Sequence, residues 1–334
     1  MTKKKLDMKI QIVCFLLVLG FSARISAQNE GGNGTVADYA GALLELHNQV
    51  VENGFQFLTY AVHEPDVQKA NARREELQGF VEQALANVKA AGDWQGDGSL
   101  RESVEEVIET HLKALREDYV ELWELRSQRN GSSEAMQAFF DAQLVMEQEA
   151  QEATERLQEV SRDFAKTHGL RLENTGDESP LMRRMKKVNQ VNEYYRTLFL
   201  VYFKAARDQE ALMPLVNGGQ WSALKDRLGP VADSLAHYRN EANDAGPFDG
   251  DDALREGVMA HLDFYQAMVN THFPVMIKVG AMPANEVTPA DGDQYNEAIT
   301  FFNTKGAALG QQFQQESQTF LQRHIPKPAE QTKL

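Results

Sequence analysis

The sequence predicts an all-α protein made of two tandem antiparallel four-helix-bundle-like repeats that arose by internal duplication. Three observations lead to this prediction. Apolar residues recur at spacings of three and four along almost the whole chain, as on the buried face of an amphipathic helix. Alternating β-branched stretches next to hairpin dipeptides are nearly absent. One segment of the N-terminal half is repeated in the C-terminal half.

Composition and charge exclude several classes of protein. The chain has 334 residues, of which 42% are hydrophobic, with 34 Lys plus Arg, 49 Asp plus Glu and a net charge of −15. These fractions are ordinary for a folded protein and exclude a disordered or collagen-like chain, while the single Cys excludes a disulfide scaffold. The negative charge argues against nucleic-acid binding, because phosphates require a basic face.

The N-terminus has the layout of a secretory signal peptide in residues 1–27. A lysine-rich start precedes an apolar run over residues 10–21, and small residues then lead to Ala27, after which we expect cleavage. The run is shorter than the ~20 apolar residues that span a bilayer, although a retained anchor is the alternative. Cys14 lies inside the run, where lipidation is not expected, and cleavage would remove it. Residues 28–34, rich in glycine, are expected to be a flexible segment.

Four apolar stripes predict four helices in the first repeat, residues 35–169. Their positions are Tyr39, Leu43, Leu46, Val50, Phe57 and Ala61; Ala70, Leu77, Phe80, Ala84 and Val88; Leu100, Val104, Ile108, Leu112, Leu115, Tyr119 and Leu122; and Met136, Phe140, Leu144, Leu157, Val160 and Phe164. Pro65 should end the first helix, residues 130–132 (Asn-Gly-Ser) should interrupt the chain before the fourth, and Gly169 is a left-handed helix stop.

The second repeat, residues 181–325, should follow a polar linker at 170–180 and precede a C-terminal tail at 326–334. Its expected helices cover roughly 181–216, 219–245, 252–280 and 290–325. Pro274 lies inside the third of them and should kink or break it.

The evidence for duplication is a segment at residues 92–104 that recurs at 246–258, displaced by 154 residues. The matched pairs are Gly92 and Gly246, Trp94 and Phe248, Gly96 and Gly250, Asp97 and Asp251, Leu100 and Leu254, Arg101 and Arg255, Glu102 and Glu256, and Val104 and Val258. A second match, of residues 48–52 with 189–193, is displaced by 141 residues and predicts about 13 extra residues within 205–232. A third, weaker match pairs Phe164 and His168 with Phe320 and His324.

The repeated motif is typical of a helix entry. Its glycines allow the chain to turn, and Asp97 and Asp251 are placed to accept hydrogen bonds from first-turn amides. The aromatic residue, Trp94 or Phe248, should pack back on the new helix as a hydrophobic staple. A calcium loop built on the aspartates of 249–252 is the alternative, but its alternating acidic ligands and distal Glu are missing.

Arg101 and Arg255 oppose the helix dipole, because each is a cation in a first turn. Each should therefore pair with a carboxylate on a neighbouring helix of its own repeat, and the alternative is that it faces a ligand.

The sequence identifies no catalytic, cofactor-binding or metal-binding residue. None of the eight histidines follows a Glu by three residues, and haem-attachment, zinc, nucleophile-elbow, phosphate-loop and dinucleotide motifs do not occur. His111 and His261 lie on or beside apolar stripes and are expected in the core, although non-covalent haem between a His and a Met is an open alternative. The acidic side chains at 102, 105, 106 and 109 should form a solvated face.

Two segments resemble an uncharacterised family of secreted helical surface proteins from spirochaetes and Bacteroidota. They are Phe248-x-Gly250-Asp251-x-x-Leu254-Arg255, followed by Phe264-Tyr265, and Phe164-Ala165-Lys166-x-His168-Gly169. The resemblance covers most of the mature chain and implies export and helical bundles, with no activity that transfers to named residues. Members often carry a lipoprotein cysteine, which this chain lacks.

Together these features predict an exported, non-enzymatic helical protein of the cell envelope or surface, periplasmic or extracellular, with an unknown macromolecular partner. The alternative is a helical bundle that binds a small molecule, haem or a metal. After cleavage, residues 28–176 carry 13 cations and 28 anions and residues 177–334 carry 16 and 20, so the first half has most of the negative charge.

Overall fold

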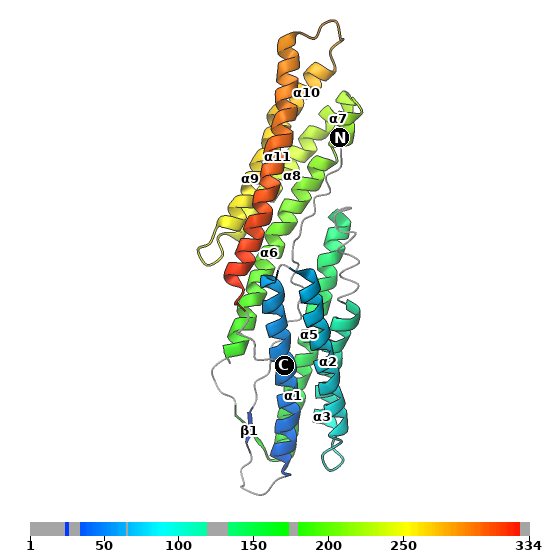
Figure 1. Ribbon diagram of the computed structural model, residues 1–334, viewed down its shortest axis with the longest axis vertical. Coiled ribbons are helices and arrows are strands. Elements are labelled where there is room, and N and C mark those ends of the chain that lie inside the picture. The colour runs from blue at the N-terminus through cyan, green and yellow to red at the C-terminus, as the bar shows by residue number, and fades with distance from the viewer. Residues whose placement is uncertain (1–23, 27–33, 65, 119–132, 174–179, 328–334) are drawn as a thin grey trace. The chain divides into compact units, whose positions relative to one another are not determined.

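In a computed structural model the described residues are 24–26, 34–64, 66–118, 133–173 and 180–327. Almost all of them are helical (Figure 1), which confirms the all-α class. The strands in these ranges are β1 (Arg24–Ser26) and β2 (Arg171–Glu173), which pair antiparallel with Ile25 opposite Leu172. None of the helices in the described part is both long and apolar enough to cross a membrane.

The helices follow one another as the apolar stripes predict. In chain order they are α1 (Val36–His63), α2 (Val67–Ala90), α3 (Ser99–Lys113), the π-helical turn η1 (Ala114–Asp118), α5 (Ser133–Thr167), α6 (Pro180–Glu210), α7 (Met213–Asn217), α8 (Trp221–Ala245), α9 (Ala253–Ala267), the π-helical turn η3 (Met268–His272), α10 (Phe273–Gly280) and α11 (Pro289–His324). The expected helix at 181–216 is divided between α6 and α7. Tyr119, Leu122 and residues 130–132 lie outside the described residues.

Local signals account for the helix ends. α1 begins at a capping box, in which the Thr35 hydroxyl accepts a hydrogen bond from the Asp38 amide and the Asp38 carboxylate accepts one from the Thr35 amide. α1 ends two residues before Pro65. α5 ends before Gly169, whose φ of +65° confirms the predicted left-handed stop.

The third helix of the second half is not broken at Pro274, since helical structure continues without interruption from Ala253 to Gly280. α9 passes through η3 into α10, which begins at Phe273, so Pro274 directly follows a change from α-helical to π-helical hydrogen bonding. The first half has the π-helical turn η1 directly after α3 without a proline. Proline is therefore not required for the π-helical turn itself.

The chain divides into two compact units, and the division falls within α6, after Gln190. The N-terminal unit contains the described residues before Val191 and those from His324 onward, and the C-terminal unit contains Val191–Arg323. This division lies ten residues beyond the end of the predicted linker at 170–180, of which residues 174–179 lie outside the described residues. The start of α6 belongs to the N-terminal unit, where the Arg184 guanidinium lies 5.2 Å from the centre of the Phe55 ring.

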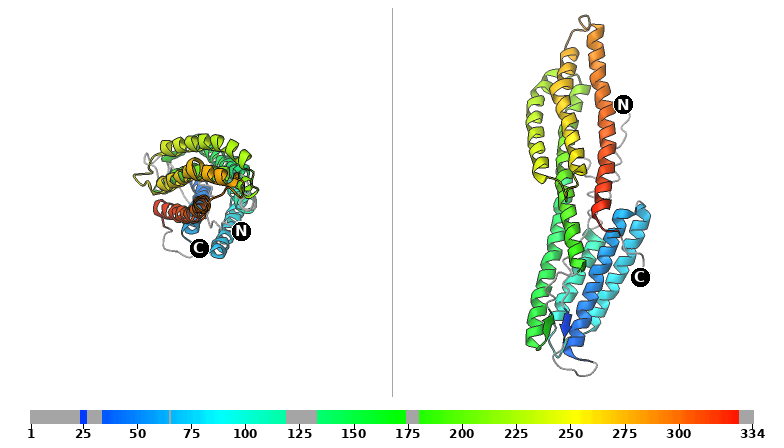
Figure 2. Two further views of the ribbon diagram at one scale, coloured as in Figure 1. Left: turned by 90° about the horizontal axis from the view of Figure 1, so that it is seen from above. Right: turned by 90° about the vertical axis from the view of Figure 1, so that its left-hand side faces the viewer.

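In the N-terminal unit, α3 packs against α1, α2 and α5, and the helices run alongside one another (Figure 2). Their buried side chains form one apolar cluster that includes Leu43, Val50, Val81, Val104, Ile108, Leu157 and Phe164. Leu144 does not join this core, because its residue is 46% exposed while Phe140 and Gln143 face inward. A strict spacing of four drifts around a helix with 3.6 residues per turn, so the Met136–Phe140–Leu144 stripe leaves the buried face.

The C-terminal unit has an aromatic core between α6, α9 and α11. The rings of Tyr202 and Phe313 stack with their centres 4.0 Å apart, and His261 meets the edge of Tyr202 at 4.7 Å. Elsewhere in this unit, the Trp221 ring lies so close to Gly280 that a Cβ atom there would be 2.3 Å from it. A glycine is therefore required at position 280 for α8 to approach α10.

Candidate functional site

The repeated motif forms a tight turn before α3. The backbones of Trp94 and Asp97 exchange two hydrogen bonds of 3.0 and 2.9 Å. Between them Gln95 and Gly96 have φ values of 51° and 89°, as in a type I′ turn. Gly92, at φ 67°, provides a further left-handed position.

The same turn precedes α9 in the C-terminal unit. Phe248 and Asp251 exchange backbone hydrogen bonds of 3.0 and 2.8 Å, and Asp249 and Gly250 have φ values of 49° and 81°. Gly246 has a φ of 61°. The glycines thus serve the turn that the sequence predicted for them, because a side chain is disfavoured at positive φ.

The aspartate of each turn, Asp97 or Asp251, contacts both the helix that follows the turn and the end of a later helix, α5 or α11. Asp97 accepts a hydrogen bond from the Ser99 amide at 3.0 Å and pairs through its second oxygen with His168 Nε2 at 2.8 Å. Asp251 likewise accepts from the Ala253 amide at 3.2 Å, and its second oxygen pairs with Arg323 at 2.5 Å. The hydrogen bond from His168 is the main cause that lowers the pKa of Asp97.

A tyrosine from the first helix of each unit completes the arrangement. The Tyr39 hydroxyl donates to the Gly92 carbonyl oxygen at 2.8 Å, and the Tyr194 hydroxyl donates to the Gly246 carbonyl oxygen at 2.7 Å. Tyr194 follows Tyr39 by 155 residues, close to the 154 residues that separate the two turns. The contacts of these tyrosines thus follow the displacement of the turns rather than the 141 residues of the second match, and the 13 extra residues derived from that match stay a prediction.

The turn aromatics pack on this tyrosine. The ring centre of Trp94 lies 5.5 Å from that of Tyr39, and the ring centre of Phe248 lies 5.2 Å from that of Tyr194. Phe248 also meets Phe320 of α11 edge-on at 5.5 Å. These ring contacts join each turn to the first helix of its unit and, for Phe248, also to the last helix. Trp94 also packs against the apolar cluster to which Leu100 and Val104 of α3 belong, which agrees with the predicted staple. Sequence reasoning missed the tyrosines, although each precedes its glycine by almost the same distance, 53 and 52 residues.

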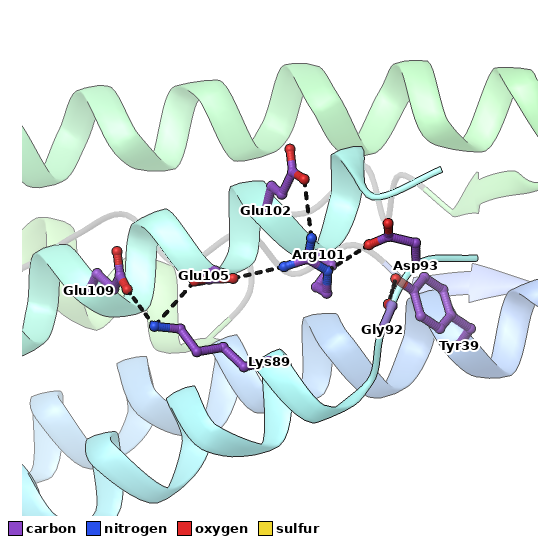
Figure 3. Close-up of polar contacts among 8 residues, drawn as sticks. All are labelled: Tyr39, Lys89, Gly92, Asp93, Arg101, Glu102, Glu105 and Glu109. Carbon is purple, nitrogen blue, oxygen red and sulfur yellow. Dashed lines mark hydrogen bonds and ion pairs between the residues drawn. The ribbon is translucent and has the colours of Figure 1, made fainter. Parts of the chain in front are cut away.

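The repeated arginines pair with carboxylates, as predicted, but these come from their own turn and helix and not from a neighbouring helix. Arg101 contacts Asp93 at 2.9 Å, Glu105 at 2.8 Å and Glu102 at 3.1 Å (Figure 3). Arg255 forms an ion pair with Asp252, in which Nε donates at 2.6 Å. These contacts raise the pKa of both guanidinium groups.

The carboxylate that holds each arginine comes from a different position of the motif. The first unit has Asp93 and Gly98, while the corresponding residues of the second are Pro247 and Asp252. A Cβ atom added at Gly98 would lie 2.7 Å from Asp93 Oδ1, so Gly98 leaves room for Asp93 to reach Arg101. Both units therefore have an ion pair at the repeated arginine, although the carboxylate stands at different positions of the motif.

The remaining motif residues have structural positions. Leu100 and Leu254 are buried in the cores, and Glu102 and Glu256 face outward. The acidic face of α3 is exposed but paired. Lys89 contacts Glu105 and Glu109 (Figure 3), and Arg156 of α5 contacts Glu106 at 2.8 Å.

Three histidines are buried. His111 and His261, which the sequence placed in the core, bond through Nδ1 to the carbonyl oxygens of Val107 and Gly257, at 2.7 and 3.0 Å. The third, His47, was missed although it lies one turn after Leu43 on the buried face of α1. Neither of its ring nitrogens has a hydrogen-bond partner in the described structure, and burial lowers its pKa to about 3.

A metal site requires several ligating side chains close together. Across the described side chains, no three His, Cys, Asp or Glu residues are grouped so as to hold a metal ion. The carboxylates of Asp251 and Asp252, which the calcium alternative requires, are directed to Arg323 and Arg255.

The fold and the two turns define an all-α protein in which a repeated turn ties three helices together. No protein-family model, no curated protein and no solved structure matches the chain.

Proposed function

We propose that the chain is an exported, non-enzymatic helical protein of the cell envelope or surface that acts as a structural or macromolecular interaction module. The observation that carries this proposal is that the residues common to the two turns contact other residues of the same unit. In each turn the aspartate, the arginine and the tyrosine make contacts within their own unit. The residues that the chain repeats therefore serve architecture, as expected of a module that presents helical faces.

Corresponding elements support the proposal that the chain consists of two tandem four-helix repeats. α3 and α9 have 15 residues each, and a five-residue π-helical turn follows both. The starts of α3 and α9 differ by 154 residues, those of α2 and α8 by 154, and those of α5 and α11 by 156. Insertions within one copy would change these displacements, so their near-constancy favours duplication of a single unit.

Export is proposed from the layout of residues 1–27, most of which lie outside the described residues. Cleavage after Ala27 would also remove β1 and leave β2 without its partner strand. The resemblance to secreted helical surface proteins supports the same proposal.

Processing is tested by expressing the whole chain in a bacterium with a periplasm and measuring the intact mass of the product. We expect a chain that begins at Gln28 in the periplasmic fraction. The matched control is the double variant Leu16→Arg, Leu17→Arg, which interrupts the apolar run and should stay unprocessed. Recovery of Met1 in the membrane fraction would contradict the proposal.

The alternative, a ligand-binding bundle, is favoured by one observation in the N-terminal unit. His111 is oriented by a bond from Nδ1 to the Val107 carbonyl, which is how the second nitrogen of a metal-bound histidine is commonly held. Native mass spectrometry of protein purified from its own envelope separates the two proposals. The interaction module should have the mass of its polypeptide, whereas a retained haem, metal or small molecule would appear as added mass.

A further inference from the structure

Two imidazoles lie in the core of the N-terminal unit, and His111 has a hydrogen bond to the Val107 carbonyl oxygen whereas His47 has none among the described residues. His47 on α1 shares a helical face with Leu43 and Val50, and His111 on α3 shares one with Val104 and Ile108. Neither nitrogen of His47 is hydrogen-bonded. A buried unpaired polar group costs stability, and a buried unpaired charge costs much more.

The C-terminal unit has tyrosines at the corresponding positions. His47 and Tyr202 each lie eight residues after the tyrosine that bonds to the turn, and His111 and Tyr265 each lie twelve residues after the first residue of their helix. Tyrosine remains neutral in acid, because its hydroxyl loses its proton only at alkaline pH. The two units therefore place an acid-sensitive pair and an acid-insensitive pair at the same points.

We propose that His47 and His111 form an acid-sensitive pair that opens the N-terminal unit in mildly acidic solution, before the C-terminal unit opens. The pair acts by stabilising the open form. In the closed unit both rings stay neutral, whereas an opened unit exposes them to water, where they take up protons.

The direction of the effect follows from linkage between protonation and opening. Burial lowers the pKa of His47 from 6.5 to about 3, and burial also lowers that of His111. The full stability is therefore present above pH 6.5 and is lost as the pH falls below it. At about pH 4.5, His47 alone should increase the population of the open form about 100-fold relative to neutral pH.

Within the described ranges, no carboxylate is among the groups that shift the pKa of either imidazole. His111 is the titratable group that acts on His47 in the described structure, and it opposes a second positive charge. The side chain of Asn48 slightly favours the charged form, although it makes no hydrogen bond of normal geometry to the ring. On His111, the Val107 carbonyl partly offsets burial. No charged group of α2 or α5 in the described part of the chain is a cause of either pKa shift.

The C-terminal unit provides an internal comparison. It contains the buried His261, which keeps a hydrogen bond to Gly257, and the half-buried His272, which stacks on Phe301. Burial lowers the pKa of both, so this unit also responds to acid. Its response should be smaller, because tyrosines occupy the two positions that carry His47 and His111 in the first unit.

The test is amide hydrogen exchange of the full chain at about pH 7.5 and pH 4.5, corrected for the intrinsic pH dependence of exchange. We expect protection in α1 and α3 to fall about 100-fold or more on acidification, and protection in α9 and in the part of α6 from Val191 onward to fall less. Equal losses in the two units would overturn the proposal.

Variants separate the pair from general acid effects. The double variant His47→Phe, His111→Phe should keep its protection at pH 4.5, while His237→Gln, which alters an exposed histidine of α8, should behave as the parent chain. If the phenylalanine variant does not fold, His47→Gln alone keeps a polar side chain and should remove about 100-fold of the acid effect. If a folded variant at His47 or His111 lost as much protection in acid as the parent chain, the proposal would be overturned.

Discussion

The two turns hold their arginines with carboxylates at different positions, Asp93 in the first turn and Asp252 in the second. This difference predicts how exchanging the two positions changes the stability of the N-terminal unit. Replacing Asp93 by Ala removes the acid that Arg101 Nε contacts at 2.9 Å. Replacing Gly98 by Asp introduces the acid that the second turn uses at Asp252. Each change alone should destabilise the N-terminal unit, and the two together should rebuild the ion pair in the form that Arg255 has.

The expected magnitudes follow from exposure and space. The Arg101 side chain is 16% exposed and that of Asp93 is 45% exposed, so Asp93→Ala should cost only about 0.5–1 kcal/mol. In Gly98→Asp the new Cβ would lie 2.7 Å from Asp93 Oδ1 and displace it from Arg101, with two like charges adjacent. We expect a cost of about 1 kcal/mol for this change, and a double variant within about 0.5 kcal/mol of the parent. The coupling energy is then about 1–2 kcal/mol.

The backbone allows this exchange. Gly98 has φ −94° and ψ −1°, close to the φ −107° and ψ −2° of Asp252, so an aspartate fits without backbone strain. Urea denaturation of the full chain, followed by hydrogen exchange of α3 amides, measures the change in free energy of opening. Gly79→Asp is the matched control, because its Cβ would point into open space on α2. The reasoning would be refuted if the free-energy costs of Asp93→Ala and Gly98→Asp simply added in the double variant. It would also be refuted if Gly79→Asp restored the stability of the Asp93→Ala variant as well as Gly98→Asp does.

Three further predictions concern the turns and the charge distribution. Tyr39→Phe and Tyr194→Phe should each destabilise their own unit by about 1 kcal/mol, because each variant loses one hydrogen bond to the turn but keeps the aromatic ring. A loss of stability no larger than that of a Tyr→Phe change at an exposed position would contradict this role of the hydroxyl groups. Asp97→Ala should cost about 1–2 kcal/mol at neutral pH. Because the folded pKa of Asp97 is lowered, its contribution is present above about pH 4 and lost below it, so melting temperatures of variant and parent should converge in acid. Residues 28–190 carry 17 cations and 30 anions, a net charge of −13, against 10 and 17, a net charge of −7, for residues 191–323. Raising sodium chloride from about 10 to 300 mM should therefore raise the melting temperature of the N-terminal unit more, and equal shifts would show that its anions are already paired.

Some features of the molecule could be read from short stretches of sequence. Apolar spacing located the helices, Pro65 and Gly169 marked two helix ends, and the glycine at position 96 or 250 predicted the turn before the third helix of each half. Each of these depends on residues within about one or two helical turns of one another. Backbone hydrogen bonds, φ preferences and amphipathic periodicity act over that range, so the local pattern is enough.

Contacts between distant residues could be predicted only in part. The sequence indicated that each repeated arginine needs a carboxylate, but not that Asp93 provides it in one turn and Asp252 in the other. Likewise, the position of His47 on the apolar face of α1 was visible in the sequence, but its lack of any hydrogen-bond partner was not.

The tertiary structure alone decided which distant groups meet. The Tyr39 hydroxyl reaches a carbonyl 53 residues away, and Asp97 reaches His168 across 71 residues. It also placed the division between the units after Gln190, within α6, rather than in the polar segment at 170–180. Such contacts depend on the angle, rotation and register at which helices pack, and these are set by the fit of many side chains at once rather than by the residues next to each group in the chain.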